Sequence, residues 1–490
     1  MGELFAFINK GQKPYRLGEN QRTRRPVTLP DTDRCTYIVG HSGMGKSTLL
    51  TNLILADIER GDRGVIVLDP HNELAEAVAL RCPPEQAHRV TYFCPSHQTK
   101  KVLGFNPFQL NSTSKQEFEL KADAIMQVFA HTWNLNYGNA PTMQNTLETF
   151  IRTLLSAYPQ YQTNLLHMLC LTRKDEVGDF WREAVLPFVR GNPAMGQNWY
   201  EWMEEGRRKT DIESSRQKIK HLLISDVLWP VLCQPTTSDC FNFQDMLTQK
   251  KVLLVALGGL DSEFVRLLGS FILTQLLVTV KLSQAEQSSP CQVYADEFYY
   301  FNPQSFQFII NEGRKFKLYC TIAHQNLTQI KNKKLEATVQ SCNNIILFKV
   351  SPDDAQQLRK HFYTPQGYIQ PHLLANLPDF HALVRYKQDR QRPQDWIKTY
   401  AEARPVNRQV AKTIWQQSVA YGRPRAEIDK IKDSILRVVP DTVTPPQTMP
   451  LAEEFPTEAT DAKPPEKTSS PEKKPQQKAK PTKFKPGFTA

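Results

Sequence analysis

The sequence lacks the usual features of a secreted, disulfide-bonded or membrane-spanning protein. Its nine cysteines are scattered, none forms C-x-x-C, and none is paired with histidines at zinc spacing. We therefore expect free thiols in a reducing cytoplasm. No basic-then-apolar export signal opens the chain. The longest apolar stretch, at 267–280, is too short to span a bilayer, and we interpret it as a buried helix.

Acidic residues are also too few to balance the basic ones, and the net charge is +11. The end of the chain, 441–490, contributes little, because eight lysines against seven acids leave +1. The stretch 112–235 is nearly neutral. The excess lies in 1–26 and in 385–437, which holds thirteen basic and six acidic residues. Basic patches on a folded body suit a polyanion such as DNA, although charge alone does not distinguish this from a merely soluble surface.

The most informative segment is GHSGMGKST at 40–48, which fits the phosphate-binding pattern G-x-x-x-x-G-K-[ST]. Its glycines let the backbone turn tightly, so that successive N–H groups point at the phosphates of a nucleotide. We expect Lys46 to reach the β- and γ-phosphates and Ser47 to offer its hydroxyl to Mg²⁺. A strand-like run precedes the loop, and apolar residues at helical spacing follow it. The predicted phosphate-binding residues are Gly40, His41, Ser42, Gly43, Met44, Gly45, Lys46, Ser47 and Thr48.

The order of the predicted elements indicates an α/β fold with a mostly parallel central sheet. Uninterrupted apolar runs are typical of buried parallel strands. Such runs occur at 36–39, 64–70, 90–95, 251–257, 291–297, 318–325 and 344–350.

Between the first three of these strands and the others, 112–235 shows apolar residues at three- and four-residue spacing and no convincing strand, as in 118–133 and 143–158. A helical insert is therefore expected to interrupt a single nucleotide-binding domain. The predicted parts are a basic N-terminal segment (1–26), the two halves of the nucleotide-binding domain (27–111 and 236–400), the all-helical insert (112–235), a helical extension (401–440) and a disordered tail (441–490).

Adjacent carboxylates, Asp296 and Glu297, end the apolar run CQVYADE. Hydrolysis of ATP needs one carboxylate to hold Mg²⁺, directly or through water, and a second to orient the attacking water. We predict that Asp296 acts with Ser47 on the metal and that Glu297 acts on the water. The sequence leaves open whether Asp69, at the end of an earlier strand, contributes to catalysis.

Two further polar residues have two interpretations each. Gln325 ends the next predicted strand, where it could sense the γ-phosphate or simply terminate the strand in a turn. Arg314 precedes that strand and could complete the site of a neighbouring subunit, or belong to a surface turn. The residues alone leave both alternatives open.

Together these motifs resemble the FtsK/HerA superfamily of RecA-like P-loop ATPases, and are closest to the type IV secretion coupling proteins that pump DNA in bacterial conjugation. The resemblance runs through 29–74, VYADEF, GRKFKLYCTIAHQNLTQI and NIILFKVSPDDAQQL, and includes YGRPRAEIDKI at 421–431. Two departures stand out. The transmembrane helices with which many coupling proteins begin are not visible, and Asn72 stands where many relatives have a glycine.

The resemblance implies an ATP- and Mg²⁺-dependent DNA translocase that works as a hexameric ring. Lys46 and Ser47 would be the P-loop pair, and Asp296 and Glu297 the Walker B acids. Gln325 would then be the sensor and Arg314 an arginine finger. The insert would choose the substrate, and secretion-channel or relaxase proteins would be partners that recruit a cytoplasmic ATPase to the inner membrane. Two alternatives remain: a protein-translocating ATPase of the same fold and a slowly hydrolysing, nucleotide-gated scaffold.

Overall fold

A computed structural model describes most of the chain. The described residues are 15–29, 35–98, 100–136, 138–204, 209–235, 242–283, 288–330, 332–364, 367–386, 394–402 and 404–436. The disordered tail expected at 441–490 lies outside them.

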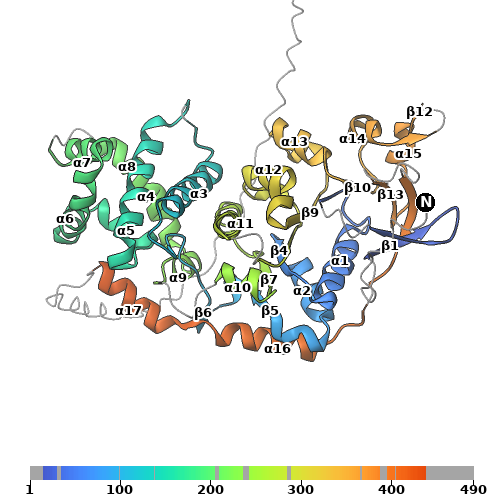
Figure 1. The fold of residues 1–490 in the computed structure, drawn as a ribbon, viewed down its shortest axis with the longest axis horizontal. Coiled ribbons are helices and arrows are strands. Elements are labelled where there is room, and N and C mark those ends of the chain that lie inside the picture. The colour runs from blue at the N-terminus through green and yellow to red at the C-terminus, as the bar shows by residue number, and fades with distance from the viewer. Residues whose placement is uncertain are drawn as a thin grey trace, which may run out of the picture. The chain divides into compact units, whose positions relative to one another are not determined.

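An 11-stranded sheet forms the centre of the fold, in the order β2-β1-β14-β13-β10-β3-β9-β8-β4-β7-β5 (Figure 1). One part is parallel from β10 to β5, and the other adds antiparallel strands beyond β10. The parallel strands are β3 (Thr36–Val39), β4 (Gly64–Asp69), β5 (Val90–Phe93), β7 (Val252–Ala256), β8 (Cys291–Ala295), β9 (Leu318–His324) and β10 (Asn344–Leu347). The antiparallel strands are β1 (Tyr15–Asn20), β2 (Pro26–Leu29), β13 (His381–Tyr386) and β14 (Gln394–Thr399).

Helices cover both faces of the parallel part, which explains the uninterrupted apolar runs of its strands. On one face, α1 (Lys46–Arg60), α2 (Glu73–Arg81) and α16 (Arg408–Ala420) pack in one hydrophobic cluster. On the other face, α10 (Phe243–Thr248), α11 (Ser262–Leu282), α12 (Pro303–Glu312) and α13 (Lys333–Gln340) belong to a second cluster. Successive residues of one strand alternate between the two clusters, as Ile66 and Val67 do. The predicted mostly parallel α/β fold is confirmed.

Seven helices and no strand lie among the described residues of 112–235, and the helices expected over 118–133 and 143–158 are confirmed. Its longest helices are α3 and α4, and α3 packs along α11 (Figure 1). The helices are α3 (Lys115–Trp133), α4 (Pro141–Tyr161), α5 (Leu165–Leu171), α6 (Glu176–Gly191), α7 (Pro193–Glu204), α8 (Lys209–Ile224) and α9 (Leu228–Leu232).

Helix α11 contains the long apolar stretch at 267–280. Among the described residues it is the one helix long and apolar enough to cross a membrane, and 83% of its most apolar window is buried inside the protein. Leu267, Leu268 and Ile272 have no exposed surface. The prediction of a buried helix is confirmed.

The predicted domain boundaries stay a prediction. Strand β1 lies within the predicted basic N-terminal segment (1–26), and it pairs with β14 in the central sheet. The extension at 401–440 comprises α16 and α17 (Arg425–Leu436), between which β15 (Arg423–Pro424) pairs with β6 (Lys101–Val102). The remaining short elements are α14 (Pro352–Leu358), β11 (Tyr363–Thr364), β12 (Gly367–Tyr368) and α15 (Pro371–Ala375).

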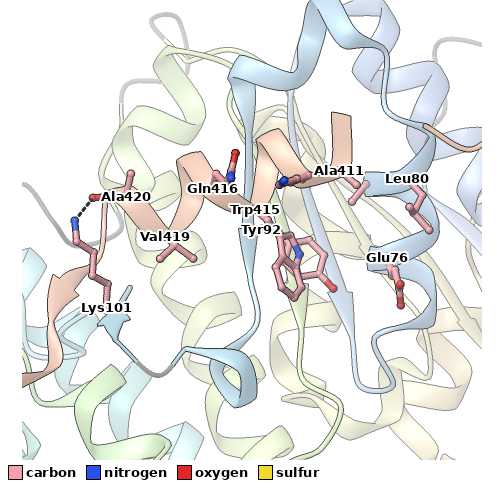
Figure 2. A pocket seen from close by; sticks show the side chains of 11 residues that line it. Glu76, Leu80, Tyr92, Lys101, Ala411, Trp415, Gln416, Val419 and Ala420 are labelled. Atoms are coloured by element: carbon pink, nitrogen blue, oxygen red, sulfur yellow. Dashed lines mark hydrogen bonds between the residues drawn. The ribbon is translucent and has the colours of Figure 1, made fainter. Parts of the chain in front are cut away.

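A cavity of about 620 Å³ lies where α16 crosses α2 and β5. Figure 2 shows Trp415 of α16 beside Tyr92 of β5, and their ring centroids are 5.7 Å apart. At one end Lys101 donates to the carbonyl of Ala420 at 3.2 Å. None of the lining residues belongs to the P-loop, so this cavity is separate from the site described below.

A buried carboxylate, Asp57 of α1, ties the antiparallel and parallel parts of the sheet to this helix. It accepts hydrogen bonds from the hydroxyls of Tyr15 in β1 and Tyr294 in β8, the latter at 2.7 Å. Arg63 Nε lies 3.1 Å from Asp57 Oδ1, and both side chains are at most 2% exposed. A buried charge is stable only while its partners remain.

We predict that Arg63→Leu lowers the free energy of unfolding by about 3 kcal/mol, because it removes a buried cation that pairs with the buried Asp57 carboxylate. Urea unfolding measures this loss. Arg24→Leu is the matched control, since Arg24 pairs with Glu19 at 3.5 Å but its side chain is 71% exposed, and it should cost less than about 1 kcal/mol. Equal losses in the two variants would show that the buried pair contributes no more to the free energy of unfolding than the exposed pair.

Candidate active site

Three neighbouring parallel strands bring the predicted site residues to one edge of the sheet. Strand β9 lies between β3, which leads into the P-loop, and β8, which leads to Asp296 and Glu297. Val39 is paired with His324, and Ala295 with Ile322, so the three strands end nearly level. The carboxyl ends of parallel strands are where ligands bind in open α/β sheets. Lys46, Asp296, Glu297 and Gln325 therefore gather there.

The P-loop has the backbone shape that its glycines predict. Gly43 and Gly45 have φ values of 79° and 105°, in the region that side chains disfavour. At Gly40, a Cβ would lie 2.5 Å from the Cβ of Phe348, so β10 approaches the loop too closely for any side chain. Gly45 is also the N-cap of α1, and the N-terminus of this helix therefore faces the space where phosphates would lie.

Lys46 lies folded against its own loop and is only 6% exposed. Its Nζ donates to the carbonyl of Gly40 at 2.6 Å and to that of His41 at 3.0 Å. Burial lowers the pKa of Lys46, while the negative charges of Asp296 and Glu297 act in the opposite direction. The ammonium is thus held at the loop by carbonyl oxygens that an anionic phosphate could replace.

The two carboxylates differ in their surroundings. Burial raises the pKa of Asp296 to about 7, and the charges of Glu297 and Asp69 add to the shift. Burial also raises the pKa of Glu297, whereas hydrogen bonding from Gln325 and the charge of Lys46 lower it. Glu297 is 4% exposed, and its Oε2 has no hydrogen-bond partner among the described residues. A buried oxygen without a partner is costly, and it is the arrangement expected of a group that binds water or ligand.

The backbone of Glu297 is itself unusual, with a φ of 43°. Left-handed backbone at a residue with a side chain costs about 1–3 kcal/mol and persists only when the surroundings hold it. Two contacts hold it here. The N–H of Glu297 donates to Asp296 Oδ1 at 3.1 Å, and the ring of the next residue, Phe298, lies 5.3 Å from that of His324. The turn therefore fixes the Glu297 carboxylate beside the end of β9.

Arg314 lies at the other end of β9, in the turn after α12, and it is exposed. The seven residues of this strand span about 20 Å. The guanidinium makes no ion pair with any described residue. Arg314 therefore does not join the cluster formed by Lys46 and the carboxylates of its own chain.

Two residues near the site have structural roles that sequence reasoning did not identify. Asp69 accepts hydrogen bonds from the backbone N–H groups of His71 and Ala75, both at 2.9 Å, so its oxygens fix the start of α2. Asn72 has a φ of 74°, and its side chain bonds the backbone of Gly258 at the end of β7. Asn tolerates left-handed backbone better than most residues, and the two bonds to Gly258 hold Asn72 in this conformation.

The residues present fit a nucleotide with Mg²⁺. Ser47 is exposed in the first turn of α1, and Asp296 is half-buried at the end of β8. Among the described residues no group of three or more His, Cys, Asp and Glu side chains converges as a metal site. Mg²⁺ does not need such a group, because it is commonly held by one or two protein oxygens together with phosphates and water.

The fold and this site define the class of RecA-like P-loop NTPases. The family model "Helicase HerA, central domain" matches residues 32–276, which is half of the chain. The chain therefore belongs to that family and to the FtsK/HerA superfamily, as its motifs predicted. No curated protein sequence matches it significantly.

Solved structures of similar fold include two forms of the coupling protein TrwB. The unbound bacterial conjugative coupling protein has 15% identity and a TM-score of 0.59, over 79% of this chain and 88% of that chain. The plasmid coupling protein in complex with ADP and Mg²⁺ has 16% identity and a TM-score of 0.59, over 79% and 90%. VirB4 of Thermoanaerobacter pseudethanolicus has 14% identity and a TM-score of 0.54, over 80% and 98%. At these identities the likeness establishes the fold.

The raised pKa of Asp296 predicts a pH-dependent stability of the nucleotide-free protein. Between its ordinary pKa of 3.8 and its folded value of about 7, the folded state binds more protons than the unfolded state. Stability from this residue therefore falls as the pH rises through 7. Asp296→Asn should be more stable than the wild type at pH 8, by about 1–2 kcal/mol after solvent screening, and should show no such gain below pH 4.

Urea unfolding at pH 4, 6 and 8 measures the difference. Asp353→Asn, which changes an exposed carboxylate, serves as the control and should show no gain at pH 8. If Asp296→Asn gains nothing at pH 8, the carboxylate is not destabilised by burial.

Proposed function

We propose that this protein is an ATP-hydrolysing DNA translocase that works as a hexameric ring. The observation that carries the proposal is the meeting of Lys46, Asp296, Glu297 and Gln325 at one edge of the sheet. Membership of the HerA helicase family supports it, and so does a fold shared with a conjugative coupling protein. The particular role is transfer of DNA in conjugation or a related secretion process.

In this proposal the P-loop N–H groups and Lys46 hold the phosphates of ATP. Ser47 and Asp296 would hold Mg²⁺, which would supply positive charge to neutralise the phosphates. Glu297 orients a water molecule and accepts its proton as the water oxygen bonds to the γ-phosphorus and the bond to ADP breaks. Its partnerless Oε2 is available for that water. Gln325, which follows the neighbouring strand β9, is proposed to sense the γ-phosphate.

The basic surface of the folded body is proposed to hold the DNA. Part of the charge in 385–437 is already used, because Arg404 pairs with Glu59 at 2.9 Å and Arg425 pairs with Asp429 at 3.2 Å. Other basic residues are exposed, and we propose these as the better candidates for contacts with DNA. They include Lys398, Arg408, Lys412, Lys430, Lys333 and Lys334.

The helical insert is proposed to select the cargo, and it touches the catalytic turn. His131 of α3 makes a hydrogen bond of 3.0 Å to the carbonyl of Tyr300, three residues after Glu297. Trp133 of the same helix donates to Glu263 of α11 at 2.8 Å. Cargo that binds the insert and moves α3 would therefore also move the turn that holds Glu297, through the bond between His131 and Tyr300. A relaxase or secretion-channel protein is proposed as the partner that brings this cytoplasmic ATPase to the inner membrane.

An ATPase assay with and without double-stranded DNA tests the proposed function. We expect DNA to stimulate turnover, and Glu297→Gln to bind ATP normally while hydrolysing it about a hundredfold more slowly, because the water loses its base. Lys46→Ala should lose tight ATP binding and is the control for the site. Turnover that is slow or indifferent to DNA would favour a scaffold or a protein-moving ATPase instead.

We predict that Arg314 serves the site of a neighbouring subunit, because β9 separates it from the carboxylates of its own chain. Arg314→Ala should bind ATP and DNA but hydrolyse ATP about a thousandfold more slowly. Mixing Arg314→Ala with Glu297→Gln should restore part of the activity, since some interfaces then carry an intact Glu297 and an intact Arg314.

Lys100→Ala is the control, because it removes an exposed basic residue outside the proposed DNA-binding surface and should stay active alone. Subunit exchange is verified independently with labelled protein. If exchange occurs and no mixing ratio restores activity, and Arg314→Ala also slows the isolated monomer, Arg314 acts on its own subunit.

A further inference from the structure

An exposed aromatic side chain, Phe380, lies against the P-loop. It is 48% exposed and precedes β13. Its backbone N–H donates to the carbonyl of Met44 at 3.2 Å. A Cβ placed on Gly45 would lie 3.0 Å from Phe380 Cδ1, so the ring edge borders the start of α1.

The backbone of Phe380 is strained, with a φ of 62°. Positive φ at a bulky residue is an outlier that calls for an explanation. Thr399 of β14 holds the residue there, since its N–H and its hydroxyl both donate to the Phe380 carbonyl, at 2.8 and 3.0 Å. Core packing does not account for the strain, because nearly half of the side chain remains exposed.

The sheet order indicates which end of a nucleotide Phe380 would meet. In the order β13-β10-β3-β9-β8, the catalytic carboxylates follow β8 on one side of the P-loop strand, and Phe380 precedes β13 on the other. Lys46 and the carboxylates mark the γ-phosphate end. The first turn of α1 cradles the α- and β-phosphates. The nucleoside therefore leaves the loop on the side of β10 and β13.

A second contact places chain from β14 at the same side. Asn52, one turn after Thr48 in α1, donates to the carbonyl of Ala401 at 3.0 Å. The residues that follow β14 thus lie along the exposed face of α1, beside Thr399, whose Oγ1 would lie 3.6 Å from a Cβ on Gly45. Phe380 and this segment together border the space next to the first turn of the helix.

We propose that Phe380 is a nucleobase-stacking residue, whose ring supports the base of the bound nucleoside triphosphate. The inference rests on the proposed nucleotide site and adds to it a contact at the nucleoside end. An aromatic face stacks on any base, so the contact contributes affinity with little discrimination between ATP and GTP. The strained backbone keeps the ring at the loop before nucleotide arrives.

Equilibrium binding to the full chain tests the proposal, with two probes. Phe380→Ala should weaken Mg²⁺–ATP binding about tenfold, and should leave the affinity for Mg²⁺–tripolyphosphate, which has no base, unchanged. Phe380→Trp should restore ATP binding. Phe380→Gly removes the ring and relieves the positive φ, so it should match Phe380→Ala in affinity even if the two differ in stability. Tyr421→Ala, which removes an aromatic side chain that is 61% exposed elsewhere, is the matched control.

The outcomes separate this inference from the proposed function. If Phe380→Ala binds ATP as tightly as the wild type while Lys46→Ala does not, the site is correct and the stacking is wrong. If Phe380→Ala loses ATP and tripolyphosphate equally, the residue shapes the P-loop, which also overturns stacking. If Lys46→Ala binds ATP normally, the nucleotide site itself is wrongly assigned.

Discussion

The position of β9 between β3 and β8 is the constraint on which the site depends. Each of these strands ends at the same edge, so one short stretch of sheet presents a phosphate-binding loop, a polar residue and two carboxylates. Burial on both faces makes this part of the sheet rigid and keeps the spacing of the three ends fixed. The same burial raises the pKa values of Asp296 and Glu297. The scaffold thus destabilises the charged carboxylates that catalysis would use.

Much of this arrangement could be predicted, because the decisive segments carry local signals. The P-loop needs glycines at fixed spacing, and buried parallel strands need uninterrupted apolar runs. Both requirements are visible in GHSGMGKST and in GVIVLD. Since parallel strands meet at one edge, residues that follow such runs can be placed together without knowing the strand order. The order β3-β9-β8, with Gln325 directly after the middle strand, could be learned only from the structure.

The elements that were missed lack such signals. Strand β1 reads YRLGEN, in which two polar residues remain half-buried, and it pairs with β14, almost four hundred residues away. Pattern reasoning sees neither the partner nor the burial that the partner supplies. The roles of Phe380 and Asn72 could not be predicted for a related reason. Their importance comes from backbone conformation and from neighbours such as Gly45 and Gly258, which are remote in sequence.

Three of the eight described non-glycine residues with positive φ lie around the site. Asn72, Glu297 and Phe380 all have positive φ, and they follow β4, follow β8 and precede β13 respectively. Each is held by bonds from another part of the sheet or from an adjacent carboxylate. Strain of this kind survives only where surrounding contacts impose it. Because His131 of the insert bonds the turn after Glu297, a change in the insert could alter one of these strained positions directly. In the proposed translocase, cargo recognition and hydrolysis would then be linked by a single turn of chain.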